Sequence, residues 1–149
     1  MEITRKKILL KLMMFAIFIA ICHLFALKFY IYWTDMWFDI PMHILSGALI
    51  SSIGLWAVYF SPLKSILLNS QKKVFLISIL FALIVGLLWE IFELNFGLIS
   101  YLFVDMVDSI KDLIDDVIGS LIAGLYFVNN IPSEFFQESE KPRRINKKT

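Results

Sequence analysis

The sequence predicts an all-α integral membrane protein, built as a four-helix transmembrane bundle. Hydrophobic residues make up 59% of the 149 positions, against about 45–50% in soluble proteins. Four stretches are apolar enough to cross a hydrocarbon core of roughly 30 Å. They lie near residues 8–31, 41–60, 74–100 and 112–130. We expect a single domain over residues 1–132 and a polar, basic tail over residues 133–149.

The first stretch follows a basic segment that contains Arg5 and Lys11. A charged start before an apolar run resembles a signal peptide, but no small-residue cleavage site follows and the run is long enough to span. We interpret it as an uncleaved transmembrane helix. We expect His23, which lies inside this helix, to be a packed residue with one hydrogen bond. Cys22 is the single cysteine, so no internal disulfide can form.

The second and third helices each carry one face of polar and small residues. In the second helix, which Pro41 is expected to open, the face is His43, Gly47, Ser51 and Gly54. In the third helix it is Gly86, Glu90, Glu93 and Gly97, with a break expected at Gly97. Small residues let helices approach closely. Carboxylates within a membrane helix are usually turned inward, paired and functional.

The fourth helix has a polar stripe made almost wholly of one acid. At 3.6 residues per turn the stripe spans an arc of about 100°. Its members are Asp105, Asp108, Asp112, Asp115, Asp116 and Gly119. A solvated helix would mix Lys and Glu into such a stripe, and like carboxylates at i,i+4 repel. Something must therefore compensate these charges.

The distribution of charge predicts the topology. With the N-terminus inside, cytoplasmic segments hold twelve of the 14 basic residues, and only Lys28 and Lys111 lie outside. The positive-inside rule favours this orientation, with both termini cytoplasmic and a multi-pass chain in a bacterial or archaeal plasma membrane. Nine of the 13 acids then fall in external loops or in the outer halves of helices. Three helices thus bring carboxylates or imidazole to one level.

These side chains predict a binding site near the external face. Protons, a metal or a cationic ligand could compensate them, since two local cations cannot neutralise nine acids. If the compensating group is a metal, oxygen-rich ligation with one His favours Mg, Mn or Ca over Zn. We expect Asp39 and Asp108 to act as a base or to support the ligands. The expected ligands are His43, Glu90, Glu93, Asp112, Asp115 and Asp116.

A simpler interpretation stands beside each assignment. Asp39 can merely cap its helix. Asp105, Asp108 and Asp112 can be solvated loop or first-turn residues, favoured by the helix dipole, and Asp35 can likewise have no role in a site. Apolar surroundings make this interpretation weakest for the Glu90–Glu93 pair and for Asp112 and Asp116.

Three motifs resemble known membrane families. Asp39-x3-His43 with Gly47 looks like a segment of VanZ-like proteins, and Trp89-Glu90-x2-Glu93 resembles an element of YjdF-like proteins. The Asp-rich helix over residues 108–124 resembles the closing helix of both. Unlike VanZ-like proteins, this chain has no Arg in the second external loop. The resemblance implies a polytopic envelope protein and supplies no reaction.

The leading hypothesis is an external pocket that binds a divalent cation and acts on a lipid or lipid-linked headgroup. A proton- or cation-coupled small transporter is the first alternative. The second is a non-catalytic membrane subunit whose small-residue faces dock a partner, in a homo- or hetero-oligomer. Whether the protein is an enzyme stays open. Nothing in the sequence indicates nucleic-acid binding, and membrane lipid is the expected surrounding.

Overall fold

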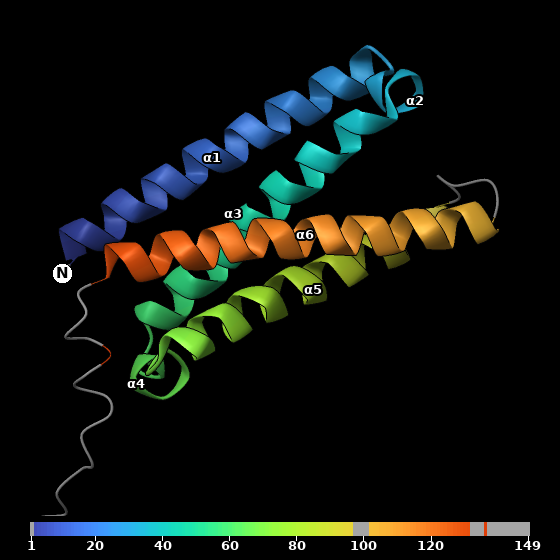
Figure 1. Cartoon of the computed structure of the whole chain (residues 1–149). Coiled ribbons are helices and arrows are strands. Elements are labelled where there is room, and N and C mark those ends of the chain that lie inside the picture. Colours follow the sequence, from blue (N-terminus) through green and yellow to red (C-terminus); the bar gives the residue numbers. More distant parts are fainter. Residues whose placement is uncertain (1, 97–101, 132–135, 137–149) are drawn as a thin grey trace, which may run out of the picture.

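The computed structural model describes residues 2–96, 102–131 and 136, and these residues are helical or in short turns. The described chain has four long helices, and short helical elements connect the first to the second and the second to the third (Figure 1). The long helices are α1 (Glu2–Lys28), α3 (Asp39–Tyr59), α5 (Gln71–Phe96) and α6 (Leu102–Asn130). The short elements are α2 (Ile31–Thr34), η1 (Met36–Phe38) and α4 (Lys64–Leu67).

Helices α3, α5 and α6 form the packed unit, and α1 lies along the other side of α3 (Figure 1). Helices α3 and α6 run in the same direction. His43 at the start of α3 faces Asp112 of α6, and further along both helices Tyr59 stacks edge-on with Phe127. Helix α5 runs the opposite way and packs against both of them. The start of α3 therefore lies beside residues 112–116 of α6, and Glu93 near the end of α5 interacts with His43 there.

Glycines set the close approach of α6 to its neighbours. A Cβ on Gly119 would collide with the carbonyl oxygen of Ile44 and lie 2.7 Å from the amide nitrogen of Ala48. A Cβ on Gly47 would meet the Asp116 backbone in the same way. The main chains of α3 and α6 thus touch directly, as small residues permit in membrane bundles.

Three serines join the packed helices below this contact. Ser51 Oγ of α3 donates to the carbonyl oxygen of Ser78 at 2.9 Å, and Ser78 Oγ of α5 donates to that of Ser120 at 2.6 Å. Ser120 Oγ donates within α6 to Val117. All three serines are fully buried. Hydroxyl groups and small side chains therefore fill this part of the interior.

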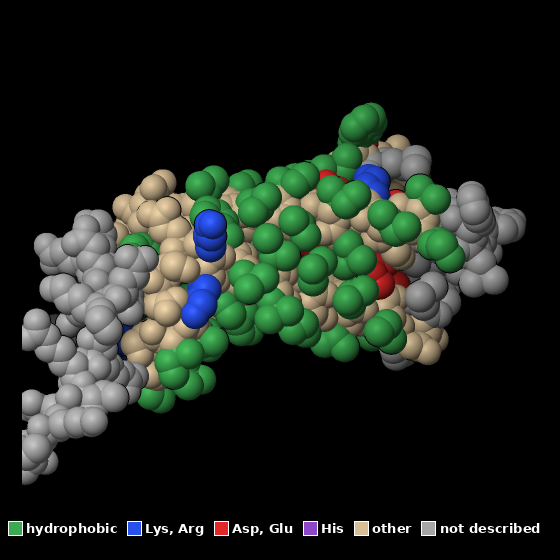
Figure 2. All heavy atoms as spheres, turned by 60° about the horizontal axis from the view of Figure 1, so that its bottom comes forward, with side chains coloured by type: hydrophobic (Ala, Val, Ile, Leu, Met, Phe, Trp, Pro, Cys, Tyr) green, Lys and Arg blue, Asp and Glu red, His purple; other side chains and the backbone are tan. Residues whose placement is uncertain are grey.

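Helix α6 has its polar stripe inside and its aliphatic face outside. Asp112, Asp116 and Ser120 are buried, whereas Ile110, Ile114 and other aliphatic residues of the opposite face are exposed. Figure 2 shows a band of hydrophobic side chains across the molecule, with acidic side chains and one basic side chain towards one end and further basic side chains towards the other. This arrangement suits a surrounding of lipid.

By length and composition, three helices of the described chain could cross a membrane: Arg5–Lys28, Asp39–Tyr59 and Gln71–Glu93. Helix α6 has 29 residues and is not among these three; it carries the charged residues of the acidic stripe.

Helices α1 and α6 are longer than the spans expected from hydropathy, because helical backbone begins in the polar sequence before each span. Helix α6 begins at Leu102, where we expected an external loop up to Lys111. The connection expected over residues 34–40 contains the η1 turn, and Pro41 sits within the first turn of α3. The expected break at Gly97 lies outside the described residues, as does most of the expected tail.

Candidate metal centre

The site lies where the start of α3 faces the middle of α6. Asp39 and His43 are one turn apart in α3, and Asp112 and Asp116 are one turn apart in α6. Spacing by four residues places each pair on one face of its helix. The glycine contact between Gly47 and Asp116 turns the two faces toward each other.

The imidazole of His43 lies between three carboxylates. Its Nε2 is 3.6 Å from Asp39 Oδ1 and 3.8 Å from Asp112 Oδ2. Its Nδ1 is 3.5 Å from Asp116 Oδ1. Among the described residues, Asp39, His43 and Asp112 each offer one ligand atom, and these three atoms lie within 4.8 Å of one another. The side chains become less exposed inward, from 25% for Asp39 to 12% for His43 and 5% for Asp112.

Several buried polar atoms of the site lack a hydrogen bond to any described residue. They include His43 Nδ1 and Asp112 Oδ1. The Asp112 side chain is only 5% exposed, so water at the surface cannot satisfy it. Buried polar atoms are normally hydrogen-bonded, and each exception calls for a partner such as a water or an ion. The site therefore offers nitrogen and oxygen atoms that could coordinate a cation and that are not hydrogen-bonded to one another.

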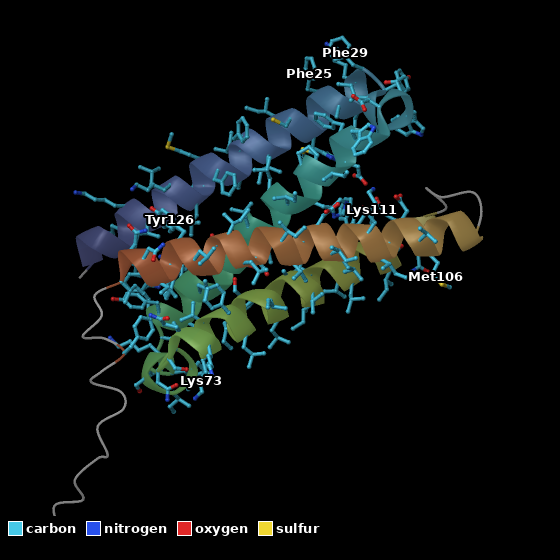
Figure 3. All side chains as sticks on the ribbon, in the orientation of Figure 1. Phe25, Phe29, Lys73, Met106, Lys111 and Tyr126 are labelled. Carbon is cyan, nitrogen blue, oxygen red and sulfur yellow. The ribbon has the colours of Figure 1, made fainter. Side chains whose placement is uncertain are left out.

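Lys111 lies at the exposed edge of the site (Figure 3). Its Nζ is 3.3 Å from Asp108 Oδ1 and 3.7 Å from Asp112 Oδ1. Burial alone would lower the pKa of Lys111, but Asp112 and Asp108 outweigh it and raise that pKa. Asp108 is half-exposed and pairs with Lys111, so it contacts water more than the interior of the site.

Tyr32 connects α1 to this end of the bundle. Its hydroxyl is 2.8 Å from His23 Nδ1 of α1, which matches the single hydrogen bond expected for that histidine. Burial raises the pKa of the Tyr32 phenol to about 12, and the nearby charges of Asp39 and Glu93 add to the effect. The corner before it is unusual, since Tyr30 has φ 56°, a value rare for a residue with a side chain.

The other predicted ligands lie outside the central group. Glu93 of α5 is half-buried and interacts electrostatically with Glu90, His43 and Asp39. Glu90 and Asp115 are buried, and each keeps one carboxylate oxygen without a hydrogen bond to a described residue. Neither belongs to the group of three ligand atoms. The side chain of Asp105 lies outside the description.

Sequence reasoning missed two residues here. Ser46 Oγ lies 3.5 Å from Asp116 Oδ1, and the spacing of three from His43 could have indicated it. Tyr32 carried no such signal, because its place depends on the corner between α1 and α3.

The comparisons with known proteins point to the membrane and not to a reaction. Searches of curated proteins and of solved structures found no match to this chain. A family described as "Predicted membrane protein (DUF2238)" matches residues 2–131, which is nearly all of the described chain. The match agrees with the apolar helices and supports a location in a membrane. The chain belongs to this family of membrane proteins.

Proposed function

We propose that the protein binds one divalent cation between Asp39, His43 and Asp112. The carrying observation is that three ligand atoms from two helices converge without hydrogen bonds among them, with Asp112 buried and His43 and Asp39 partly buried. One imidazole with carboxylate oxygens suits Mn or Mg, and Ca or Zn is the next choice. Asp39 is thus a ligand in this proposal, where the sequence suggested a base.

The separations support this assignment. Two ligand atoms that each lie about 2.1 Å from one ion are about 3.0–3.6 Å apart, depending on the angle between them. The observed values of 3.6 and 3.8 Å from His43 Nε2 lie at or just beyond that range. A small contraction would complete the set. Three protein ligands would leave positions on the ion for water or a substrate.

We further propose that this end of the bundle faces the external side of a plasma membrane, with four spans and both termini cytoplasmic. Arg5, whose guanidinium stacks 5.3 Å from the ring centre of Trp56, marks the opposite end together with Lys64 and Lys73. Figure 3 places Lys73 and Lys111 at different ends. The positive-inside rule then assigns the end with Lys73 to the cytoplasm.

At the external end the ion would lie near the headgroup level of the outer leaflet. Exposed Trp33 and Trp37 come just before Asp39 in the chain and exposed Trp89 just before Glu90, and Trp is typical of membrane interfaces. A lipid or lipid-linked headgroup is therefore the proposed substrate, with its phosphate polarised by the ion. The motif resemblance to YjdF-like and VanZ-like envelope proteins is compatible with this role.

The packing favours this proposal over the two alternatives. A transporter needs a path through the bundle, but Gly47, Gly119 and the buried serines bring the helices into direct contact below the site. The small residues that were expected to dock a partner protein pack inside the chain. Gly54, for example, faces the ring of Phe81.

The proposal is tested by the metal content of detergent-purified protein, measured by mass spectrometry after incubation with Mn²⁺ and desalting. We expect about one ion per chain in the wild type and none in Asp112→Asn. Asp108→Asn is the matched control, because Asp108 belongs to the same helix but is half-exposed. Equal metal content in the wild type and Asp112→Asn would overturn the proposal.

A further inference from the structure

The two nitrogens of His43 face different surroundings. Nε2 faces two carboxylates that also face each other, Asp39 and Asp112. Nδ1 faces Asp116 alone, at 3.5 Å. A metal-bound histidine coordinates through one nitrogen and usually donates the N–H of the other to a carboxylate or carbonyl. The gathering of ligand atoms around Nε2 makes Nδ1 the donor.

Asp116 is held in place by all three packed helices. Its own helix is α6, and its side chain is 7% exposed. Gly47 of α3 packs on its backbone, and a Cβ on Gly47 would lie 2.7 Å from the Asp116 Cα. Gly86 of α5 leaves the space that Asp116 Oδ2 fills, since a Cβ there would collide with that oxygen. A carboxylate fixed on this side of the ring cannot easily reach the Nε2 side.

We propose that Asp116 is a positioning residue of the metal centre and not one of its ligands. It accepts the N–H of His43 Nδ1 and so keeps Nε2 directed at Asp39 and Asp112. Contraction of the site around an ion would shorten the 3.5 Å separation to hydrogen-bonding distance. The inference rests on the proposed function, but the orientation of the ring can be tested without a metal.

The first test compares Mn²⁺ affinity among the wild type, Asp116→Ala and Asp112→Ala, titrated by the electron paramagnetic resonance signal of free Mn²⁺. We expect Asp116→Ala to keep one site per chain with a dissociation constant raised about 10–100-fold, the usual effect of losing such a partner. Asp112→Ala should lose the site. Loss of the site in both variants would make Asp116 a ligand, and unchanged affinity in Asp116→Ala would remove its role; either result overturns the inference.

Gly86→Ala provides a second variant that alters no candidate ligand. The added methyl group would occupy the place of Asp116 Oδ2 and push that carboxylate away from its position. We expect the same weakened binding as in Asp116→Ala. Gly124→Ala is the control, because Gly124 lies two turns along α6 from the site and faces the ring of Phe75. Equal affinities in Gly86→Ala and Gly124→Ala would contradict the inference.

The second test observes the ring nitrogens directly by ¹⁵N NMR in detergent micelles at one fixed pH. The chain has two histidines, and His23 serves as an internal control because its Nδ1 contacts Tyr32 instead. We expect His43 Nδ1 to carry a proton in the wild type and to lose it in Asp116→Ala, with the His23 signals unchanged. Unchanged His43 signals would overturn the inference. A wild type that binds no ion would instead refute the proposed function itself.

Discussion

Ser78 of α5 donates a 2.6 Å hydrogen bond to the carbonyl oxygen of Ser120 in α6, one turn from Asp116. Its own carbonyl accepts from Ser51 of α3 at 2.9 Å. One buried residue thus links all three packed helices and fixes how far each is shifted along the others. The distances in the candidate metal centre depend on that register.

We therefore expect Ser78→Ala to lower the free energy of unfolding by about 0.5–1.5 kcal/mol, the usual net value of one such hydrogen bond. Thermal unfolding in detergent would measure the change. Ser65→Ala is the control, because Ser65 is exposed in α4 and its loss should have little effect. Equal stabilities of the two variants would show that the serine contact does not hold the helices.

Gly119→Ala should destabilise the protein more than Gly124→Ala does. A Cβ at Gly119 meets main-chain atoms of Ile44 and Ala48, which cannot move without separating α3 from α6. At Gly124 the nearest atom, 2.8 Å away, belongs to the side chain of Phe75, which can rotate. We expect a loss of about 1–3 kcal/mol at Gly119, the range for overpacked sites, and less at Gly124. The reverse order in thermal unfolding would contradict the proposed helix contact.

Asp39 and Asp108 should differ in their effect on metal binding. Asp39 lies 3.6 Å from His43 Nε2, whereas Asp108 pairs with Lys111 at the exposed edge. We expect Asp39→Asn to weaken Mn²⁺ binding at least about tenfold, because it removes a charged ligand. Asp108→Asn should change it less than about threefold, since exposed pairs contribute little. Isothermal titration calorimetry of both variants measures the Mn²⁺ affinity. A stronger effect at Asp108 would make Asp108 the ligand and Asp39 the residue outside the site.

The topology can be tested by labelling single cysteines with a membrane-impermeant maleimide in a Cys22→Ser background. We expect a cysteine at Trp37, which is 77% exposed, to react in intact cells. A cysteine at Ser65 should react only after the cells are permeabilised, because the positive-inside rule places α4 in the cytoplasm. Labelling in the opposite pattern would invert the protein and place the candidate metal centre on the cytoplasmic side.

The sequence was informative about the helices and about which side chains face inward. The helical spacing of polar and apolar residues, together with their hydropathy, indicated the four long helices. The stripe of aspartates without intervening basic residues indicated that Asp112 and Asp116 lie inside the bundle. Both residues are buried in the structure. The spacing of residues along one helix decides which of its side chains face inward, so the positions of the neighbouring helices were not needed for this prediction.

The sequence could not decide which acids meet. That depends on the rotation of α6 against α3, which is set by the contacts of Gly47 and Gly119 with the opposite main chain. As a result Asp39 joins the central group, while Glu90 and Asp115 are buried outside it. The corner at Tyr30 was also beyond prediction, because a non-glycine residue at φ 56° follows no sequence pattern.

The most direct measurement is the anomalous scattering of Mn²⁺ in crystals of the loaded protein. The account predicts one strong anomalous peak within about 2.2 Å of Asp39 Oδ1, His43 Nε2 and Asp112 Oδ2, with Asp116 on the Nδ1 side of the ring. Fully loaded crystals with no peak among these three residues would contradict the central claim. The buried acids would then be compensated by protons or by a cationic ligand.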